Sequence, residues 1–422
     1  MNTNYLRFRN RALRIAVRGA LIAVAAATAA HAAEKDADDS AVAALTEAKS
    51  TFTVGAGYVS DDSFKFGEFN RLQSKGVYGV GSFDFRGGGK YDSNDASRWR
   101  IFGTDLGLDN RSVFAEYDQQ GLFKIYVGYD GLRRNRSDSY QTPYSGAGSS
   151  TLTLPANWTV PLLPQVSATA VNARGLSSTV AQSSALVNGV LTSPTPAQQA
   201  TSAAIIAADV PAFHNVNLST KRNDYSAGLN YLLGHNWEFS ASAKHEKKDG
   251  LKPMGTVTRT TGGDISTIIP DPIDQKTDQF NASVTYRGKK EFVQFSYYAS
   301  LFTNNIDSVT WTNWASPATT MTMSSAPSNK FHQFGLTGGY NFSNASKVVV
   351  NASYARNTQD DVFLTDTSTP LVPVASLDGQ VVTKAFNAQY TAKPIKKLNV
   401  TLRYKYDDRD NRTSSNIFSF YD

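Results

Sequence analysis

The sequence predicts an all-β fold: a transmembrane, antiparallel, up-and-down β-barrel of the outer-membrane type, with about fourteen strands. Three observations predict it. From position 51 onward, apolar and polar residues alternate with a period of two in runs of about ten residues. Short turns alternate with long connectors along the chain. After the N-terminus, no apolar run reaches the roughly 20 residues that a membrane helix needs.

The N-terminus has the parts of a secretory signal peptide. Five arginines between positions 7 and 18 precede an apolar run at 19–30, and Ala30-His31-Ala32 is a small-x-small cleavage site. An inner-membrane anchor is the alternative, but the run is short for a span. We assign residues 1–32 to the signal peptide, 33–50 to a periplasmic leader and 51–422 to the barrel.

The charge and cysteine counts exclude several classes of function. Removing the five arginines of the signal peptide lowers the formal net charge from +6 to +1, which leaves no basic surface of the kind that nucleic acid requires. The chain has no cysteine. This excludes disulfides, thiolate metal sites, cysteine nucleophiles and covalent c-type haem attachment through C-x-x-C-H.

The alternation assigns one face of each strand to lipid. Leu229, Val284, Phe295 and Val350 fall on the apolar face, with Ser, Thr, Asn and Gln on the other. A soluble β-sandwich also alternates, but these strands are long and their aromatic residues gather near the strand ends. The expected strands start near Phe52, Val77, Trp99, Ser112, Leu122, Asp224, Asn236, Asp278, Glu291, Lys330, Ser346, Val382, Lys397 and Asn416.

The connectors predict the topology. Tight turns are expected at 234–236, 288–290, 343–345 and 393–395, and long connectors at 248–277, 304–329, 357–381 and, longest, about 133–222. Short turns are periplasmic and long loops external in outer-membrane barrels. The longest connector is rich in Ala, Ser, Thr and Pro and is expected to be a mobile external loop, with a short helix or an inward-folded plug as alternatives.

No catalytic, cofactor-binding or metal-binding residue is predicted, and we expect no enzyme. The four histidines outside the signal peptide, His214, His235, His245 and His332, lack metal-ligand spacing. No G-x-S-x-G motif is present, and the glycines at 87–89 are expected in a turn. The acidic stretches 61–62 and 407–411 are expected to be charged turns rather than Ca²⁺ loops.

The expected lumen face is mildly charged. Its scattered ionisable residues are Lys124, Glu238, Lys244, Arg287, Arg403 and Lys405. They form no single-sign constriction of the kind that selective pores use, so the lumen could hold water or another protein.

Four segments resemble the MtrB/PioB family of outer-membrane proteins associated with decahaem cytochromes. They are 58–68 (YVSDDSFKFGE), 106–112 (LGLDNRS), 136–155 (RSDSYQTPYSGAGSSTLTLP) and 404–413 (YKYDDRDNRT). The resemblance implies a barrel in the bacterial cell outer membrane that sheathes a periplasmic multihaem c-type cytochrome, with an extracellular cytochrome as a second candidate partner. Haem is then carried by the partner, and this chain binds no cofactor. The N-terminal cysteine pair of some relatives is missing.

Two expectations remain open at this point. The function alternative is a diffusion or substrate-selective porin. The last expected strand, 416–421, is shorter than the 9–11 residues of a spanning strand, and relatives continue beyond it. We therefore expect an open or incompletely closed sheet, in a chain that lacks later strands.

Overall fold

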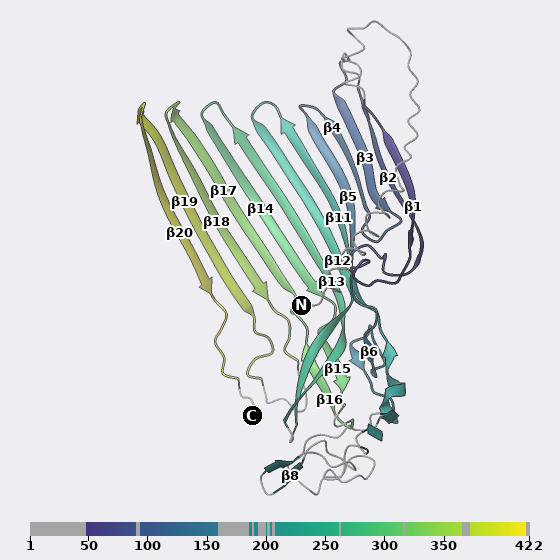
Figure 1. Ribbon diagram of the computed structural model, residues 1–422. Coiled ribbons are helices and arrows are strands. Elements are labelled where there is room, and N and C mark those ends of the chain that lie inside the picture. Colours follow the sequence, from purple (N-terminus) through teal and green to yellow (C-terminus); the bar gives the residue numbers. More distant parts are fainter. Residues whose placement is uncertain are drawn as a thin grey trace, which may run out of the picture.

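The main element of the molecule is one curved sheet of thirteen antiparallel strands, in the order β1-β2-β3-β4-β5-β11-β12-β13-β14-β17-β18-β19-β20 (Figure 1). The computed structural model describes residues 48–89, 93–158, 185–187, 190–192, 200, 203–204, 207–260, 263–314, 317–364 and 372–418. The predicted signal peptide and most of the predicted leader lie outside these residues. The strands of the main sheet are β1 (Thr51–Val59), β2 (Gly76–Gly88), β3 (Ser97–Leu106), β4 (Ser112–Gln119), β5 (Phe123–Ser137), β11 (Leu218–Leu233), β12 (Trp237–Thr260), β13 (Gly263–Arg287), β14 (Glu291–Asn304), β17 (Asn329–Ser343), β18 (Ser346–Gln359), β19 (Gly379–Ile395) and β20 (Leu398–Asn411).

The apolar face forms a continuous belt across the sheet, as the alternation predicts. One row of cross-strand neighbours runs through Tyr231, Phe239, Val284, Phe295, Leu336, Ala352, Phe386 and Tyr406. Leu229 and Phe295 are 41% and 51% exposed, although both are large apolar residues. An exposed apolar band of this extent requires a nonaqueous environment, and lipid supplies it.

Aromatic rings lie on the apolar face near the short turns. The rings of Trp237 and Tyr286 have centroids 5.0 Å apart, and the ring of Phe342 contacts those of Tyr340 and Tyr390 at 5.1 and 6.3 Å. Amphipathic rings at this level are typical of the interfacial girdle of a membrane barrel.

Short turns and long connectors lie at opposite ends of the strands, as predicted (Figure 1). The turns near 234–236, 288–290 and 343–345 stand where the sequence places them. The fourth was placed wrongly at 393–395, because β19 continues through Pro394 to Ile395 and the chain turns at 396–397. The glycines expected in a turn at 87–89 instead continue β2 as far as Gly88.

Several strands extend beyond their expected ends into the predicted loops. Residues 248–277, expected as a loop, are mostly the extensions of β12 and β13, which stay paired out to Thr260↔Gly263. The loop expected at about 133–222 is shorter, because β5 continues to Ser137 and β11 begins at Leu218. The stretch 407–411, expected as a charged turn, is the end of β20.

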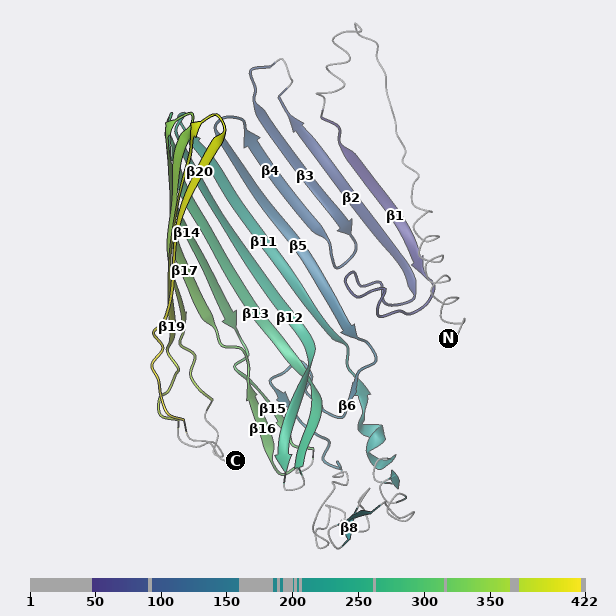
Figure 2. The same cartoon turned by 60° about the vertical axis from the view of Figure 1, so that its left-hand side comes forward.

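Small elements lie beyond the long-connector end of the main sheet (Figure 2). They are β6 (Gln141–Thr142), β7 (Thr151–Leu152), β8 (Ala185–Val187), β9 (Val190–Thr192), the 3₁₀ turn η1 (Val210–Ala212), β10 (His214–Asn215), β15 (Ser308–Thr312) and β16 (Thr320–Ser324). Much of the predicted helix-or-plug region lies outside the described residues. In the part of the chain that the structure describes, no helix is both long and apolar enough to cross a bilayer.

The sheet has two free edges. β1 and β20 stand at the ends of the strand order, and within the described residues neither pairs with a second neighbour. The expected fourteenth strand is not formed over 416–418, and residues 419–422 lie outside the description. The structure thus has thirteen strands in the main sheet, against about fourteen expected, and the predicted open sheet is observed for the described residues.

Candidate functional site: the lumen face and the loop core

The polar face of the sheet, opposite the apolar belt, lines the lumen. Across β11 to β18 its middle is uncharged: one cross-strand row runs through Asn230, Ser240, Ser283, Ser296, Gly335 and Ser353. A hollow of about 300 Å³ lies over Ser240, Ser283 and Ser296 of this row and their neighbours Asn281, Tyr298 and Gln333. Short hydroxyl and amide side chains make this part of the wall smooth and hydrated.

Large aromatic rings on the lumen face lie flat against the wall. Tyr78, Tyr126 and Phe292 each stand opposite a glycine of the neighbouring strand, namely Gly57, Gly228 and Gly339. A Cβ atom built on any of these glycines would overlap the opposite ring. The missing side chains therefore give the rings room to lie along the sheet, where they project little into the lumen.

Strands β2 and β3 carry a charge network on the lumen face that the sequence analysis missed. Asp84 accepts hydrogen bonds from Arg100 Nε and Nη2, both at 2.9 Å, and from Arg86 Nε at 3.0 Å. The Arg100 guanidinium also lies 4.3 Å from the ring centroid of Phe102. Asp84 and Arg86 are two residues apart and therefore share one face of β2. This spacing is the sequence signal from which the network could have been predicted.

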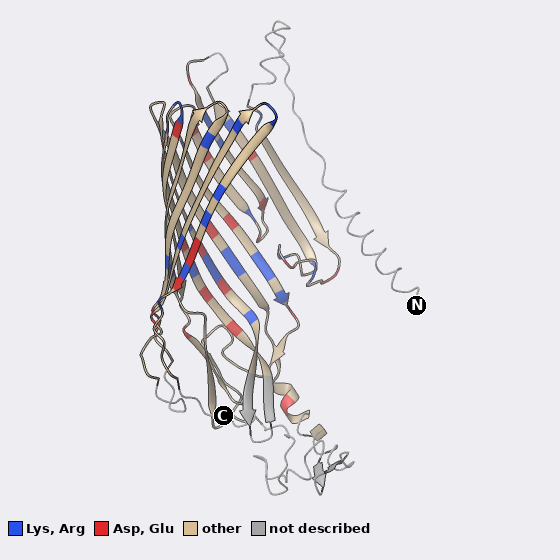
Figure 3. Cartoon of the chain, turned by 90° about the vertical axis from the view of Figure 1, so that its left-hand side faces the viewer, with Lys and Arg blue, Asp and Glu red and all other residues tan. Residues whose placement is uncertain are grey.

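A second charged region lies on β11 and β12 toward the long-connector end. Lys244 Nζ lies 3.0 Å from Asp224 Oδ2 and 3.7 Å from Glu246 Oε2, while Arg222 Nε lies 3.1 Å from Glu246 Oε1. Asp130 stands directly opposite Asp224 on β5. Figure 3 shows that acidic and basic residues of neighbouring strands form a band across the sheet at this level.

The six predicted lumen residues all lie on the polar face, but they are not isolated. Lys124 pairs with Glu116 at 2.7 Å, Arg287 pairs with Glu238, and Arg403 Nε donates to Gln389 Oε1 at 3.0 Å. Lys244 and Lys405 pair with carboxylates as well. The paired charges lie on some strands and are missing from the uncharged row described above. The charges of the lumen face are therefore grouped, whereas the sequence analysis expected them to be scattered.

Two connectors and the extended end of β13 meet in a compact hydrophobic cluster beyond the neighbouring strands, which we call the loop core. Its buried members are Tyr144, Leu152, Ile269, Val309 and Trp311. The β7 strand pairs in parallel with β15, and Tyr144 Oη donates to the carbonyl of Thr312 at 2.9 Å. Burial raises the pKa of Tyr144 well above its usual range, because desolvation disfavours the phenolate. The hydrogen bond of this hydroxyl joins the segment after β5 to the segment after β14.

Three of the four segments that resemble the MtrB/PioB family meet near this end of the sheet. Arg133 of β5 donates from Nη1 to Asp109 Oδ2 at 2.8 Å. The backbone N–H of Asn135 donates to the carbonyl of Glu68 at 2.7 Å, and its side-chain amide donates to Gly67 and Gln73. The loop after β1 thus covers the edge of β5 beyond Asp130, where the pairing with β4 stops. Residues 140–155 enter the loop core. The residues here have a structural role.

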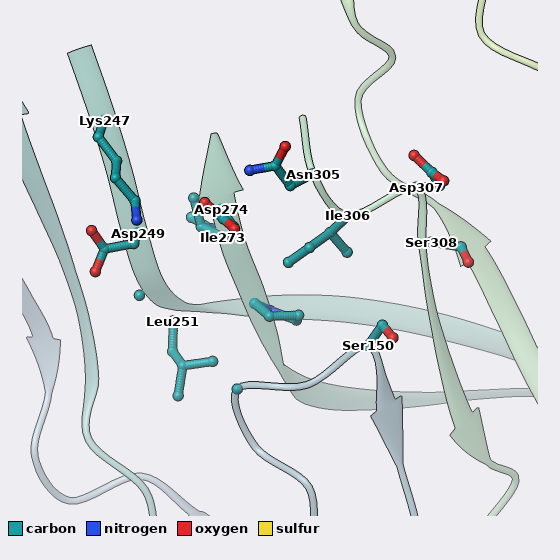
Figure 4. Close-up of a pocket in the computed structure, with 13 residues that line it drawn as sticks. Ser150, Lys247, Asp249, Leu251, Ile273, Asp274, Asn305, Ile306, Asp307 and Ser308 are labelled. Carbon is teal, nitrogen blue, oxygen red and sulfur yellow. The ribbon is translucent and has the colours of Figure 1, made fainter. Parts of the chain in front are cut away.

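Within the described residues, neither the histidines nor the hollow beside the loop core shows a catalytic arrangement. His245 contacts Asp278 at 2.6 Å and His332 contacts Tyr297 at 2.8 Å, both on the apolar face. A hollow of about 690 Å³ lies between the sheet and the loop core, with Lys247, Asp249 and Asp274 on one side (Figure 4). Among the described residues, no three His, Cys, Asp or Glu side chains are placed to hold a metal ion.

Comparison with solved structures finds distant similarity to an outer-membrane protein and to a hydrocarbon channel. The outer-membrane expressed OmpT of Vibrio cholerae is 8% identical, with a TM-score of 0.27 over 85% of this chain and 88% of that chain. The CymD monoaromatic hydrocarbon channel is 10% identical, with a TM-score of 0.27 over 85% of this chain and 82% of that chain. Similarity at this level supports no conclusion about the fold or the function of this chain.

Comparison with protein families and curated sequences is more specific. The family model "outer membrane beta-barrel porin, MtrB/PioB" matches residues 58–421. The outer membrane protein MtrB of Shewanella baltica (strain OS185) is 26% identical over 378 residues, which are 87% of this chain and 46% of the relative. The chain thus spans about half the length of that relative. The family is one of porin-like barrels rather than enzymes, and its place is the bacterial outer membrane. The chain belongs to the MtrB/PioB family of outer-membrane β-barrel proteins.

Proposed function

We propose that this chain forms the wall of a sheath around a multihaem c-type cytochrome, and that the complex carries electrons across the outer membrane. The observation that carries the proposal is membership of the MtrB/PioB family over residues 58–421, together with the association with decahaem cytochromes that the resemblance implies. The chain itself has no cysteine, so covalently bound c-type haem must belong to a partner.

The lumen face supports this role physically. Hydrocarbon about 30 Å thick is an insulator, so electron transfer requires a chain of cofactors inside a sleeve whose backbone groups are paired. The uncharged row from Asn230 to Ser353 and the rings that lie flat over Gly57, Gly228 and Gly339 leave the wall smooth. A smooth, hydrated wall suits a folded protein that must fit closely. In this proposal the wall positions and insulates the haems and catalyses nothing.

The experiment is purification of the tagged protein from outer membranes, followed by haem staining. The proposal expects a haem-staining protein in about equal molar amount, no haem on this chain, and loss of electron exchange with extracellular acceptors or donors in a deletion strain. A porin is the alternative. A deletion strain with normal extracellular electron exchange and impaired uptake of small solutes would contradict the sheath and support the porin.

A further inference from the structure

The short-turn end of β12 to β20 is strongly basic. Six lysines lie there, and all are exposed. They are Lys289, Lys290, Lys347, Lys393, Lys396 and Lys397. We call them the basic rim. Figure 3 shows Lys and Arg at these turns. Arg287 and Arg403 lie just inside the rim, and the carboxylates at this level are Glu238 and Glu291. The formal charge of these eight cations and two carboxylates is +6, whereas the whole chain without its predicted signal peptide carries +1.

The charges of the rim lysines are uncompensated. In the described part of the chain, none of the six lysines forms an ion pair, although the two acids have other partners. Glu238 pairs with Arg287, and Glu291 accepts from the backbone N–H of Lys290. Like charges held together on neighbouring turns repel one another. Such a cluster is stabilised when an anionic partner binds.

The alternation within the strands directs part of the rim toward the lumen. In β18, Lys347 alternates with Val348, a neighbour of Tyr340 and Tyr390 on the apolar face. Lys347 itself stands opposite Thr391, which shares a face with Gln389 and Lys393. Arg403 stands opposite Gln389. Lys347 and Lys393 of the rim, and Arg403 just inside it, therefore lie on the lumen side of the sheet, away from lipid.

We propose that the basic rim is the docking surface for an acidic face of the multihaem cytochrome, at the mouth through which that protein enters the lumen. The proposal rests on the proposed function. Haem propionates and surface carboxylates are anions of the required kind. Charges at a rim act mainly by steering the encounter and fixing orientation, so docking should weaken as salt increases. Phospholipid headgroups are the other anions at this level, but the lumen-side position of Lys347, Lys393 and Arg403 favours a protein in the lumen.

The test compares two quadruple variants with the same change in charge. The rim variant carries Lys347→Gln, Lys393→Gln, Lys396→Gln and Lys397→Gln. The control carries Lys221→Gln, Lys247→Gln, Lys276→Gln and Lys330→Gln, which alter the apolar-face side of the opposite end. Each tagged protein is purified from outer membranes and washed at about 0.15 M salt, and retained haem is measured by staining. We expect the rim variant to retain about tenfold less haem than the parent and the control to retain as much as the parent.

Other outcomes separate the two proposals. If the parent retains haem and the rim variant retains as much, the docking surface is wrong and the sheath stands. If the parent retains no haem even at low salt, the sheath itself fails. If the rim variant keeps haem but loses binding to phosphatidylglycerol vesicles, the rim binds lipid, and the docking proposal is overturned.

A cross-linking measurement does not depend on how the quadruple variants fold. The chain has no cysteine, so Lys393→Cys introduces a single thiol on the lumen side of the rim, and Lys384→Cys introduces one on the apolar face. A benzophenone maleimide attached at position 393 should cross-link to a haem-staining protein, and one at position 384 should not. Cross-links of equal yield from both positions would contradict the docking surface.

Discussion

The guanidinium of Arg133 lies 2.8 Å from the carboxylate of Asp109, and the two side chains are only 15% and 13% exposed. The pair joins β5 to the turn between β3 and β4. Arg133 also donates to Asn135 Oδ1 at 2.8 Å, which links it to the residue that fixes the loop after β1. Removing one member of a largely buried pair leaves the other charge without a partner.

The first prediction follows from this pair. Arg133→Met should lower the free energy of unfolding by about 2–3 kcal/mol, which is below the range for fully buried pairs because water still reaches both groups. The measurement is urea unfolding of the detergent-solubilised chain. Arg136→Met is the control, because its side chain forms no ion pair within the described residues. An equal loss in both variants would mean that the Asp109 contact contributes nothing specific.

The second prediction tests which face meets lipid. Leu229→Arg and Val284→Arg should each destabilise the assembled sheet by about 2–4 kcal/mol, because a charge at the midplane of a bilayer is poorly solvated. Ser283→Arg, one residue along on the lumen face, should cost far less. The measurement is resistance to denaturant of protein assembled in outer membranes. If Ser283→Arg were the more damaging change, the faces would be exchanged.

The features that the sequence predicted correctly depend on residues close together in the chain, and the features that it missed depend on residues far apart in it. The period-two pattern depends on neighbours along one strand, and it placed Leu229 and Val284 on the correct face. The extension of β12 and β13 was missed because Pro253 and Pro270 look like loop residues. In the structure they stand opposite each other in a hairpin that projects beyond the neighbouring strands, where a missing N–H is tolerated.

The loop core could not be predicted from local patterns. Tyr144 and Thr312, whose hydrogen bond joins two connectors, are 168 residues apart, and nothing in the periodicity of either segment indicates the other. The Asp84 network was easier to predict from the sequence, since Asp84 and Arg86 share one face of β2 and Arg100 stands opposite Arg86. The acidic end of β20 was read as a turn because charges are rare in soluble strands, whereas Asp410 here pairs with Val382 of β19.

The third prediction concerns topology. Long connectors of outer-membrane barrels are external and short turns periplasmic, so Ala326 should lie outside the cell and Asn344 inside the periplasm. Both residues are exposed, and the absence of cysteine makes each substitution to Cys a unique thiol. On intact cells, a membrane-impermeant maleimide should label Ala326→Cys and leave Asn344→Cys unlabelled until the outer membrane is permeabilised. The reverse labelling pattern would invert the sheet in the membrane.

The fourth prediction separates the loop core from the wall. Tyr144 is 1% exposed and packs with Leu152, Val309 and Trp311, so Tyr144→Ala removes a buried ring and should cost about 3–5 kcal/mol. Tyr144→Phe keeps the ring but loses the hydrogen bond to Thr312, and should cost about 1 kcal/mol. The loop core lies beyond the strands that carry the apolar belt. The damage should therefore be local: amides of 140–155 and 308–324 should exchange hydrogen faster in Tyr144→Ala, while those of β14 and β17 should keep the parent's protection. Loss of protection throughout the sheet would show instead that the loop core is required for assembly of the wall.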